Sequence, residues 1–577
     1  MNRPNANSKS VEELISNKIF KVPEYQRNFS WEKKNWEDLW NDVIEGLTTE
    51  TDHFIGTIIL KSTNKNEICK DNITTYSIFD VVDGQQRITT IYLFLIALYR
   101  LGNKSIKEKI KRDNYYRIEL GNLNNEFFKK IIDNKKVSPK ILTNELVLDA
   151  LNYFENKIKE FKKSNKIEDL TRYLLNSVIF LEFILQDESL AIKAFECLND
   201  RGKPLTLLDK TKSLLMYYSM RYMDNSLSVL INNSFGNVFN NYDLIKNYGK
   251  SHNIDAINSN RFGEEEILRF FYHYFALYSI ENYKIDCPYN VDITSDDVFN
   301  SYLKTFCKGL KQDKEKLKRF VEDFCVNFNK FTEGFKRLLE KIKTDSKIKN
   351  LFVFLGINIR VYPLIIGLET ENILTPKFIN LIETLDLRIY KFGAGYARKD
   401  LYRNAISAIK TNPESDKIYD KVKWFITSYD YNFDYGIRNF NYYQYDRNII
   451  KYILWQYEKY RNKKFNSNNI KLYSTVEIEH TFSQDTSTSF PAFNFIDKDE
   501  YSNKIQDIGN LCLLEGPLNK ISNNLIPERK SEHYQKSIVP STKSLGFKIE
   551  NHGYKKEDII ERGEKIRNFC KDKWIVN

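Results

Sequence analysis

The chain lacks the features that would place it in a membrane or send it out of the cell. None of its apolar runs reaches the roughly 18 residues that a membrane-spanning helix needs. Its first residues, Met1 to Asn7, do not contain the apolar stretch of a signal peptide. The sequence therefore predicts a protein without a membrane segment that stays in the cytoplasm.

Cysteine and histidine are scarce, which limits disulfide and metal chemistry. The seven cysteines are scattered, and no two of them have the Cys-x-x-Cys spacing of a zinc ribbon. Their low density argues against a disulfide framework and fits a reducing compartment. Of the six histidines, a pair such as His533 and His552 would lack the Cys or carboxylate cluster that completes a zinc site.

The charge balance and the length of the chain constrain its partners and its domain count only loosely. The chain has 88 Lys and Arg against 77 Asp and Glu, a net charge of +11. This balance is compatible with a polyanionic partner such as DNA, but it is spread thinly over a long surface and decides little alone. A length of 577 residues predicts about two to four domains, because single cores rarely exceed about 250 to 300 residues.

The most informative stretch is residues 83–87, Asp-Gly-Gln-Gln-Arg, which join a strand-like run to a helix-like run. Gly84 lets the chain turn without a Cβ penalty, and the free N–H groups of the following helix favour an anion. Arg87 adds a planar fork suited to phosphate oxygens, and Asp83 could hold a metal or orient that fork. A plain glycine turn with a solvated arginine would use the same residues. The predicted strand covers 76–82 and the predicted helix covers 88–98.

Further blocks surround this turn in a specific order. They are residues 20–31, a helical pattern at 36–44, a strand-like run at 53–60, and 194–205 followed by Asp209 and Lys212. Over roughly residues 10 to 220, this order resembles the N-terminal domain of the GmrSD-type modification-dependent restriction family, a ParB-like fold with the same Asp-Gly-Gln-Gln-Arg hallmark. The resemblance implies a domain that binds and hydrolyses a nucleoside triphosphate and senses modified DNA. The residues implied in nucleotide binding are Gln26, Arg27, Asp83, Gly84, Gln85, Gln86 and Arg87.

The middle of the chain predicts helices. Charged and apolar positions alternate at helical spacing over residues 100–190 and again over 260–465. The clearest amphipathic segments are 265–278, 314–328, 331–343 and 449–460. We found no repeat period or low-complexity tract in this part of the sequence.

The C-terminal region holds a second motif. Glu477 to His480 ends a strand-like alternation, Asn510 opens a second apolar run, and Asn519 follows it. This order resembles the HNH, or ββα-metal, nuclease hairpin, and especially the C-terminal HNH domain of GmrSD-type proteins. Lys530, Tyr534, Arg562 and Trp574 fall in the family's trailing pattern, whereas Ser483 replaces its usual proline.

The chemistry of phosphodiester hydrolysis fits these residues. A neutral His480 would take the proton of the attacking water. Glu479 and Asn519 would give Mg²⁺ (or Mn²⁺) the oxygen ligands it prefers, with Glu477 as a spare ligand on the same strand face. Asn510 would hydrogen-bond to the His480 ring and so fix its orientation.

These observations predict a mainly α protein with small α+β domains: a ParB-like nucleotide-binding domain with inserted helices at 1–225, a helical middle at 226–465, and an HNH domain at 466–577. The predicted activity is a nucleotide-regulated, metal-dependent DNA endonuclease or nickase acting on modified foreign (phage) DNA. Two alternatives stay open: a nucleotide-switched DNA-binding sensor with an inactive HNH domain, and a nuclease in which residues 83–87 only clamp the DNA backbone. The sequence does not fix the DNA modification, the preferred nucleotide, nicking against double-strand cutting, or whether the chain forms a homo-oligomer.

Overall fold

The computed structural model describes residues 6–23, 26–69, 74–139, 141–185, 206–259, 261–393, 398–484 and 493–576. This part of the chain is mainly helical and forms two compact units, of which unit 1 holds Met1–Ser251 and Asn260–Lys336, and unit 2 holds His252–Ser259 and Arg337–Asn577. The prediction of a mainly helical chain with a small mixed portion is confirmed. The ParB-like and HNH assignments and the three domain boundaries stay predictions. The motif block 194–205 lies outside the described residues.

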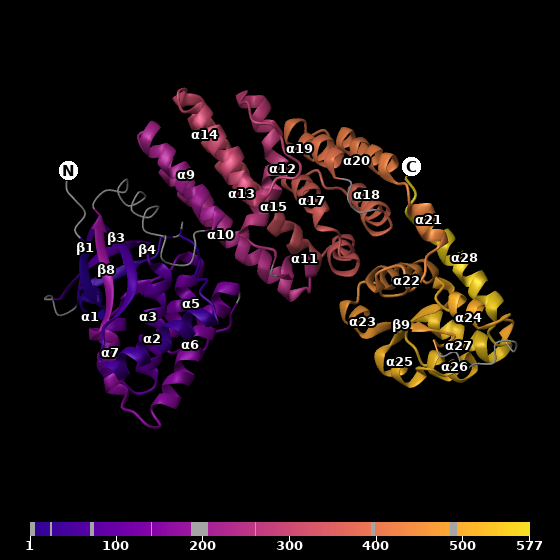
Figure 1. The fold of residues 1–577 in the computed structure, drawn as a ribbon, viewed down its shortest axis with the longest axis horizontal. Coiled ribbons are helices and arrows are strands. Elements are labelled where there is room, and N and C mark those ends of the chain that lie inside the picture. Colours follow the sequence, from indigo (N-terminus) through magenta and orange to yellow (C-terminus); the bar gives the residue numbers. More distant parts are fainter. Residues whose placement is uncertain are drawn as a thin grey trace. The chain divides into compact units, whose positions relative to one another are not determined.

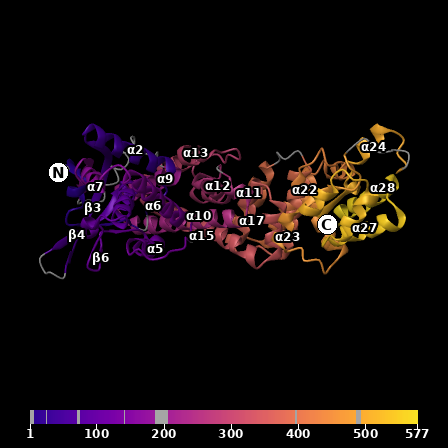
Figure 2. The same cartoon turned by 90° about the horizontal axis from the view of Figure 1, so that it is seen from below.

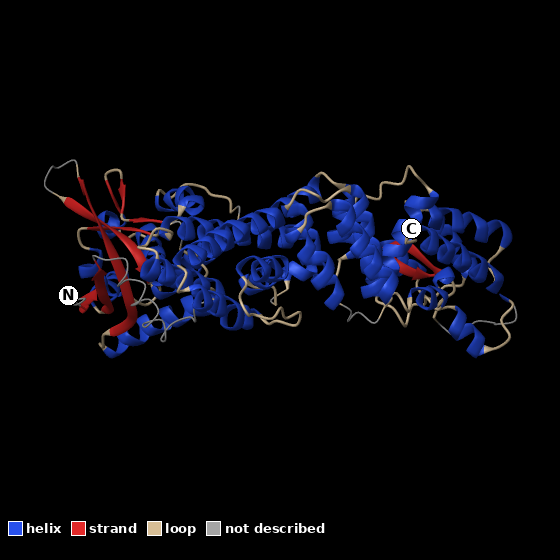
Figure 3. Ribbon diagram, turned by 90° about the horizontal axis from the view of Figure 1, so that it is seen from above, coloured by secondary structure: helices blue, strands red, loops and turns tan. Residues whose placement is uncertain are grey.

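A six-stranded mixed sheet lies in the core of unit 1 (Figure 3). The strand order is β1-β8-β3-β4-β2-β7, with β3 antiparallel to β4 and parallel to β8, and with β2 parallel to β4. Parallel neighbours need long crossover connections, which explains why helices separate these strands in the sequence. The strands are β1 (Ala6–Ser10), β2 (Lys18–Lys21), β3 (His53–Ile68), β4 (Thr75–Asp83), β7 (Ile118–Glu119) and β8 (Val178–Leu185).

Strand β4 runs through Gly84 directly into helix α3 (Gln85–Arg100), which confirms the predicted strand, turn and helix. Residues 88–98 of α3 are all buried, because this helix is apolar on every side. Gly84 has a φ of +88°, and a Cβ there would lie 3.0 Å from the carbonyl oxygen of Thr57. A side chain would be strained by both the backbone angle and the close approach, so glycine is required at this turn.

Several helices share one hydrophobic core with α3, and four of them lie close to it in Figure 1. They are α1 (Val11–Ile15), α2 (Lys33–Thr49), α6 (Leu142–Phe161) and α7 (Ile167–Asn176). Phe94 of α3 stacks on Phe154 of α6 with ring centroids 4.6 Å apart, and Trp40 of α2 packs against the same Phe94 ring. The smaller elements of this part are the 3-10 helix η1 (Lys104–Ile106), α4 (Lys107–Ile110), β5 (Lys111–Arg112), β6 (Tyr115–Tyr116) and α5 (Asn122–Ile132).

A second, all-helical part of unit 1 follows in the sequence. Its long helices α10, α12 and α15 run side by side (Figures 1 and 2), joined by aromatic contacts such as Phe271 with Phe324 and Phe235 with Phe328. Helix α15 is continuous where the sequence indicated two amphipathic segments, because Asn329 and Lys330 between them do not break a helix. The elements are α9 (Leu207–Tyr222), α10 (Ser228–Ser251), α12 (Glu264–Tyr283), α13 (Ser295–Asp297), η3 (Val298–Leu303), α14 (Lys304–Leu310) and α15 (Lys314–Glu340), whose last residues belong to unit 2.

Unit 2 is helical around one two-stranded hairpin. The buried Glu383 joins its elements by accepting hydrogen bonds from Tyr452, Lys573 and Trp574 at 2.7 to 3.0 Å. The helices before the hairpin are α11 (Asp255–Asn258), η4 (Lys341–Lys343), α16 (Ser346–Lys349), η5 (Asn350–Leu355), η6 (Ile359–Val361), α17 (Tyr362–Thr370), α18 (Pro376–Leu385), η7 (Asp386–Lys391), η8 (Leu401–Ile406), α19 (Ser407–Thr411), α20 (Ser415–Tyr429), α21 (Phe433–Arg438), α22 (Arg447–Arg461) and α23 (Ile470–Thr475).

The hairpin pairs β9 (Val476–His480) with β10 (Leu511–Glu515) in antiparallel register, with His480 opposite Leu511 and Glu477 opposite Leu514. The short helix α25 (Gly516–Ser522) follows β10 directly, so the predicted strand, strand and helix are all present. Arg562 donates hydrogen bonds to the carbonyls of Gly509 and Leu511 and so ties the start of β10 to the last helix. The remaining helices are α24 (Lys498–Lys504), η10 (Ile508–Asn510), α26 (Pro527–Gln535), α27 (Pro540–His552) and α28 (Lys556–Lys573).

Candidate functional site

His480 ends strand β9 in a partly buried position. Its Nε2 lies 3.4 Å from Oε1 of Gln506, and its ring meets the Tyr442 ring edge-on at 4.6 Å between centroids. Burial, together with the nearby cations of Lys530 and Arg447, lowers the pKa of His480 to about 4 against the opposing effect of Gln506. The imidazole is therefore neutral at pH 7, which is the form that accepts a proton.

Asn510 holds the backbone that follows His480. Its Oδ1 accepts the N–H of Phe482 at 2.8 Å, and its Nδ2 donates to the carbonyls of Phe482 and Ile505. The residue is fully buried and all of these bonds go to main chain. The hydrogen bond predicted from Asn510 to the His480 ring is not formed: the ring lies beside the side chains of Gln506 and Gln484, and Asn510 acts through the loop that follows His480.

Glu479 points away from His480, as the alternation of a strand requires. Its Oε1 accepts a 2.6 Å hydrogen bond from Nζ of Lys530 and a 3.2 Å bond from the hydroxyl of Tyr534. Lys530 also donates to the carbonyl of His480 at 2.6 Å, and its side chain is 0% exposed. Burial raises the pKa of Glu479, against the effect of Lys530. The role of Glu479 as a metal ligand stays a prediction, and it requires this buried ion pair to open.

The carboxylate next to Asn519 belongs to Glu477. Nδ2 of Asn519, on α25, lies 2.7 Å from Oε2 of Glu477, and both side chains reach the surface. This pair and the partners of His480 form two separate groups of contacts. Among the described residues no cluster of three or more His, Cys, Asp or Glu side chains is arranged to hold a metal ion. Glu477 and Asn519 carry a carboxylate and an amide oxygen, which are the ligand types that a hard cation prefers.

Sequence reasoning missed the residues that surround His480. Gln506 lies in the turn before β10, Arg447 begins α22, and its guanidinium lies 5.2 Å from the Tyr442 ring. Gln506, Arg447 and Tyr442 lie outside the short hairpin motif. Folding of the chain places the segment around residue 442 next to the end of β9. Arg447 places a cation near the base, where it could contact a phosphate oxygen.

The turn in unit 1 has a geometry suited to an anion. Gly84 is the N-cap residue of α3 and has no side chain, so no N-cap side chain accepts a hydrogen bond from the first N–H groups of the helix. Arg87 donates to the carbonyl of Thr57 at 2.5 Å, lies 3.9 Å from Asp83, and packs against Gly56, where a Cβ would be 3.1 Å from its Nε. Burial raises the pKa of Asp83, and Arg87 opposes that effect.

The glutamines of the turn hold the segment 26–31 in place. Gln85 donates to the carbonyl of Arg27, and Gln86 accepts the N–H of Ser30 at 2.8 Å while donating to the carbonyl of Asn28. Gln26 in turn donates to the carbonyl of Val82 at 2.8 Å. These side chains position backbone in the structure, and their predicted contacts with a nucleotide stay predictions. Arg27 lies 3.5 Å from Glu264.

His480 ends the first strand of this hairpin, and Glu477 of the same strand contacts Asn519 of the helix that follows the second strand. Two family models match the chain. The GmrSD restriction endonuclease N-terminal domain matches residues 11–216, and the GmrSD restriction endonuclease C-terminal domain matches residues 427–569.

The two matches together cover more than half of the chain, which therefore belongs to the GmrSD restriction endonuclease family. It is a restriction nuclease, and its substrate is DNA. Comparison with curated proteins gave no significant match. Within the described residues, no helix is both long and apolar enough to cross a membrane.

Proposed function

We propose that this restriction nuclease is a metal-dependent DNA endonuclease or nickase that is regulated by a nucleoside triphosphate and acts on modified foreign (phage) DNA in the cytoplasm. The observation that carries the proposal is the neutral, partly buried His480 at the end of β9, in a hairpin that continues into α25 with Glu477 and Asn519. The modified target and the nucleotide come from the family resemblance of the two domains.

In the nuclease reaction, His480 would accept the proton of the attacking water at Nδ1, because the oxygen of Gln506 lies beside Nε2 and favours the neutral tautomer with its proton on that nitrogen. Lys530 fixes the carbonyl of His480, so that the base keeps its place at the strand end. Glu479, once released from Lys530, and Asn519 would hold Mg²⁺ or Mn²⁺ through oxygen, with Glu477 as a further ligand, and such a ligand set suits a hard cation. The metal would supply positive charge to the scissile phosphate.

In unit 1, the N-terminus of α3 and Arg87 would bind the phosphates of the nucleotide, and Asp83 would orient Arg87. Gln26, Arg27, Gln85 and Gln86 would fix the segment against which the nucleotide lies. A chain in which this turn only clamps DNA would use the same residues without hydrolysis. Arg87→Ala separates the two cases, because triphosphate hydrolysis should be lost if the turn binds the nucleotide.

The nuclease proposal is tested by nicking of a supercoiled plasmid with His480→Ala and with the control His552→Ala, which lies on the surface end of α27. Loss of a general base typically slows a reaction by about 10²- to 10⁴-fold. We expect that loss for His480→Ala, with parental triphosphate hydrolysis, and parental cleavage for His552→Ala. Parental cleavage by His480→Ala would contradict the assignment.

A second candidate is a nucleotide-switched DNA-binding sensor whose hairpin is catalytically inactive. The buried ion pair of Glu479 with Lys530 favours it, because this carboxylate is not available to a metal as the structure stands. Such a protein would bind DNA but leave plasmid intact with every divalent cation. Cleavage in Mg²⁺ or Mn²⁺ that stops in chelator would exclude this candidate.

A further inference from the structure

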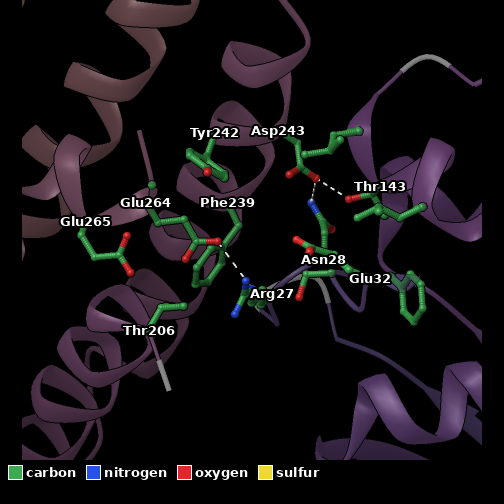
Figure 4. Close-up of a pocket in the computed structure, with 15 residues that line it drawn as sticks. Arg27, Asn28, Glu32, Thr143, Thr206, Phe239, Tyr242, Asp243, Glu264 and Glu265 are labelled. Carbon is green, nitrogen blue, oxygen red and sulfur yellow. Dashed lines mark hydrogen bonds and ion pairs between the residues drawn. The ribbon is translucent and has the colours of Figure 1, made fainter. Parts of the chain in front are cut away.

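A cavity of about 180 Å³ lies in unit 1 beside the segment 26–31 (Figure 4). Its walls come from that segment, from the first residues of α6 and α12, from the N-cap of α9 and from the middle of α10. Asp243 and Glu264 lie after residue 216, where the N-terminal family match ends. The cavity is therefore built partly by residues that the family match does not describe.

The cavity contains a buried carboxylate oxygen that needs a partner. Glu264 is 7% exposed, its Oε1 lies 3.5 Å from Nε of Arg27, and neither its Oε2 nor that Nε has a hydrogen-bond partner among the described residues. A buried polar atom without a partner is unfavourable, so a ligand that pairs it is favoured. Burial raises the pKa of Glu264 to about 7, against the effect of Arg27.

A second carboxylate of the cavity, that of Asp243, already has hydrogen-bond partners on its Oδ2. Asp243 accepts hydrogen bonds from Asn28 at 2.7 Å and from Thr143 at 2.6 Å (Figure 4). Arg27 and Glu264 therefore offer one donor and one acceptor side by side, and the aromatic rings of Phe239 and Tyr242 form the apolar wall. A flat ring with an N–H beside a hydrogen-bond acceptor matches this lining.

The volume of the cavity and the charges that line it restrict the class of ligand further. An apolar cavity of about 150 Å³ accommodates a benzene ring, so this one has room for a single heterocycle and none for a whole nucleotide. Four carboxylates, those of Glu32, Asp243, Glu264 and Glu265, line it against one arginine. Phosphates would be repelled by this lining and would stay outside.

We propose that the cavity binds one nucleobase, whose N–H edge pairs with Glu264 Oε2 and whose acceptor pairs with Arg27. The base comes either from a free nucleoside triphosphate or from DNA, by leaving the stack. The inference rests on the proposed function for its ligand class and adds the residues that read the base.

The test compares the full-length parent with Glu264→Gln, with Leu142→Trp, which would fill the cavity, and with the control Glu266→Gln, which lies on the same helix but not in the lining. The probes are the four ribonucleoside triphosphates, and DNA duplexes with and without one mismatch, whose unpaired base leaves the stack more easily.

We expect Glu264→Gln and Leu142→Trp to weaken binding of the preferred triphosphate by about 10- to 100-fold, or to lose the preference for the mismatched duplex if DNA is the source. Glu266→Gln should keep both. Hydrogen exchange of the parent gives an independent measurement, because a bound base should protect amides of residues 239–243.

Parental binding of all probes by both cavity variants, or no protection of 239–243 by a ligand that the parent binds, would overturn the inference. If Arg87→Ala loses the triphosphate while Glu264→Gln retains it, the proposed function stands and this inference fails. If the parent binds no triphosphate, nucleotide regulation fails, and the mismatch arm alone decides whether the cavity takes a base.

Discussion

Removing Lys530 should open the hairpin that carries His480. The side chains of Lys530 and Glu479 are 0% and 8% exposed, and the Nζ atom makes two 2.6 Å hydrogen bonds, to Glu479 and to the carbonyl of His480. Loss of one partner of a buried ion pair costs about 3–5 kcal/mol, because the remaining charge stays buried. Lys530→Met should therefore destabilise the β9 and β10 pairing by about that amount.

The measurement is hydrogen exchange of the amides of residues 476–480 and 511–515 in the full-length chain. A loss of about 3–5 kcal/mol corresponds to exchange that is about 10²- to 5 × 10³-fold faster. The double variant Lys530→Met with Glu479→Gln should recover most of the loss, since no charge is then left buried. A change below about threefold in Lys530→Met would refute the role of the ion pair.

The loss should also depend on pH. In the parent, the folded-state pKa of Glu479 is already raised above its ordinary value of 4.5, and removal of Lys530 raises it further. Folded Lys530→Met would then hold a proton that the unfolded chain releases, so stability falls as pH rises from about 4.5. Exchange in the variant should accelerate with pH beyond the intrinsic trend seen in the parent.

Three further outcomes follow from the same structure. Gly84→Ala should destabilise unit 1 by about 1–3 kcal/mol in thermal unfolding, because φ is +88° and the new Cβ would meet the Thr57 carbonyl. The folded pKa of His480 is about 4, below its ordinary 6.5, so the unfolded chain takes up the proton first as pH falls. Its contribution to stability should be present above pH 6.5 and lost between 6.5 and 4, and His480→Ala should flatten that part of a melting profile. Asn519→Ala and Glu477→Gln should each raise the Mg²⁺ concentration for half-maximal cleavage by about tenfold or more, and equal metal dependence in parent and variants would contradict that site.

The local parts of both motifs were predictable from the sequence. A strand that stops at Asp83, a glycine, and an apolar run predict strand, turn and helix, because these signals act over a few neighbouring residues. The two strands of the hairpin and the helix of Asn519 followed from the same kind of signal. The roles of the individual side chains were harder to predict, because the alternation along β9 alone does not show which carboxylate faces a lysine.

The partners of the site residues could not be predicted, because they depend on packing between distant segments. Lys530 and Glu479 are 51 positions apart, and Arg27 meets a glutamate from the first turn of α12. No short motif links such residues in a single sequence. For the same reason the two amphipathic segments that form α15 looked separate, whereas their common burial makes them one helix.

The segment 26–31 connects the turn to the cavity in unit 1. Gln85 and Gln86 bind its backbone on one side, and its Arg27 and Asn28 side chains line the cavity on the other. A ligand that shifts this segment must change both sets of contacts, and such coupling is reciprocal for binding free energies. A base in the cavity should therefore alter nucleotide affinity at Arg87, and a nucleotide at Arg87 should alter base affinity by the same factor.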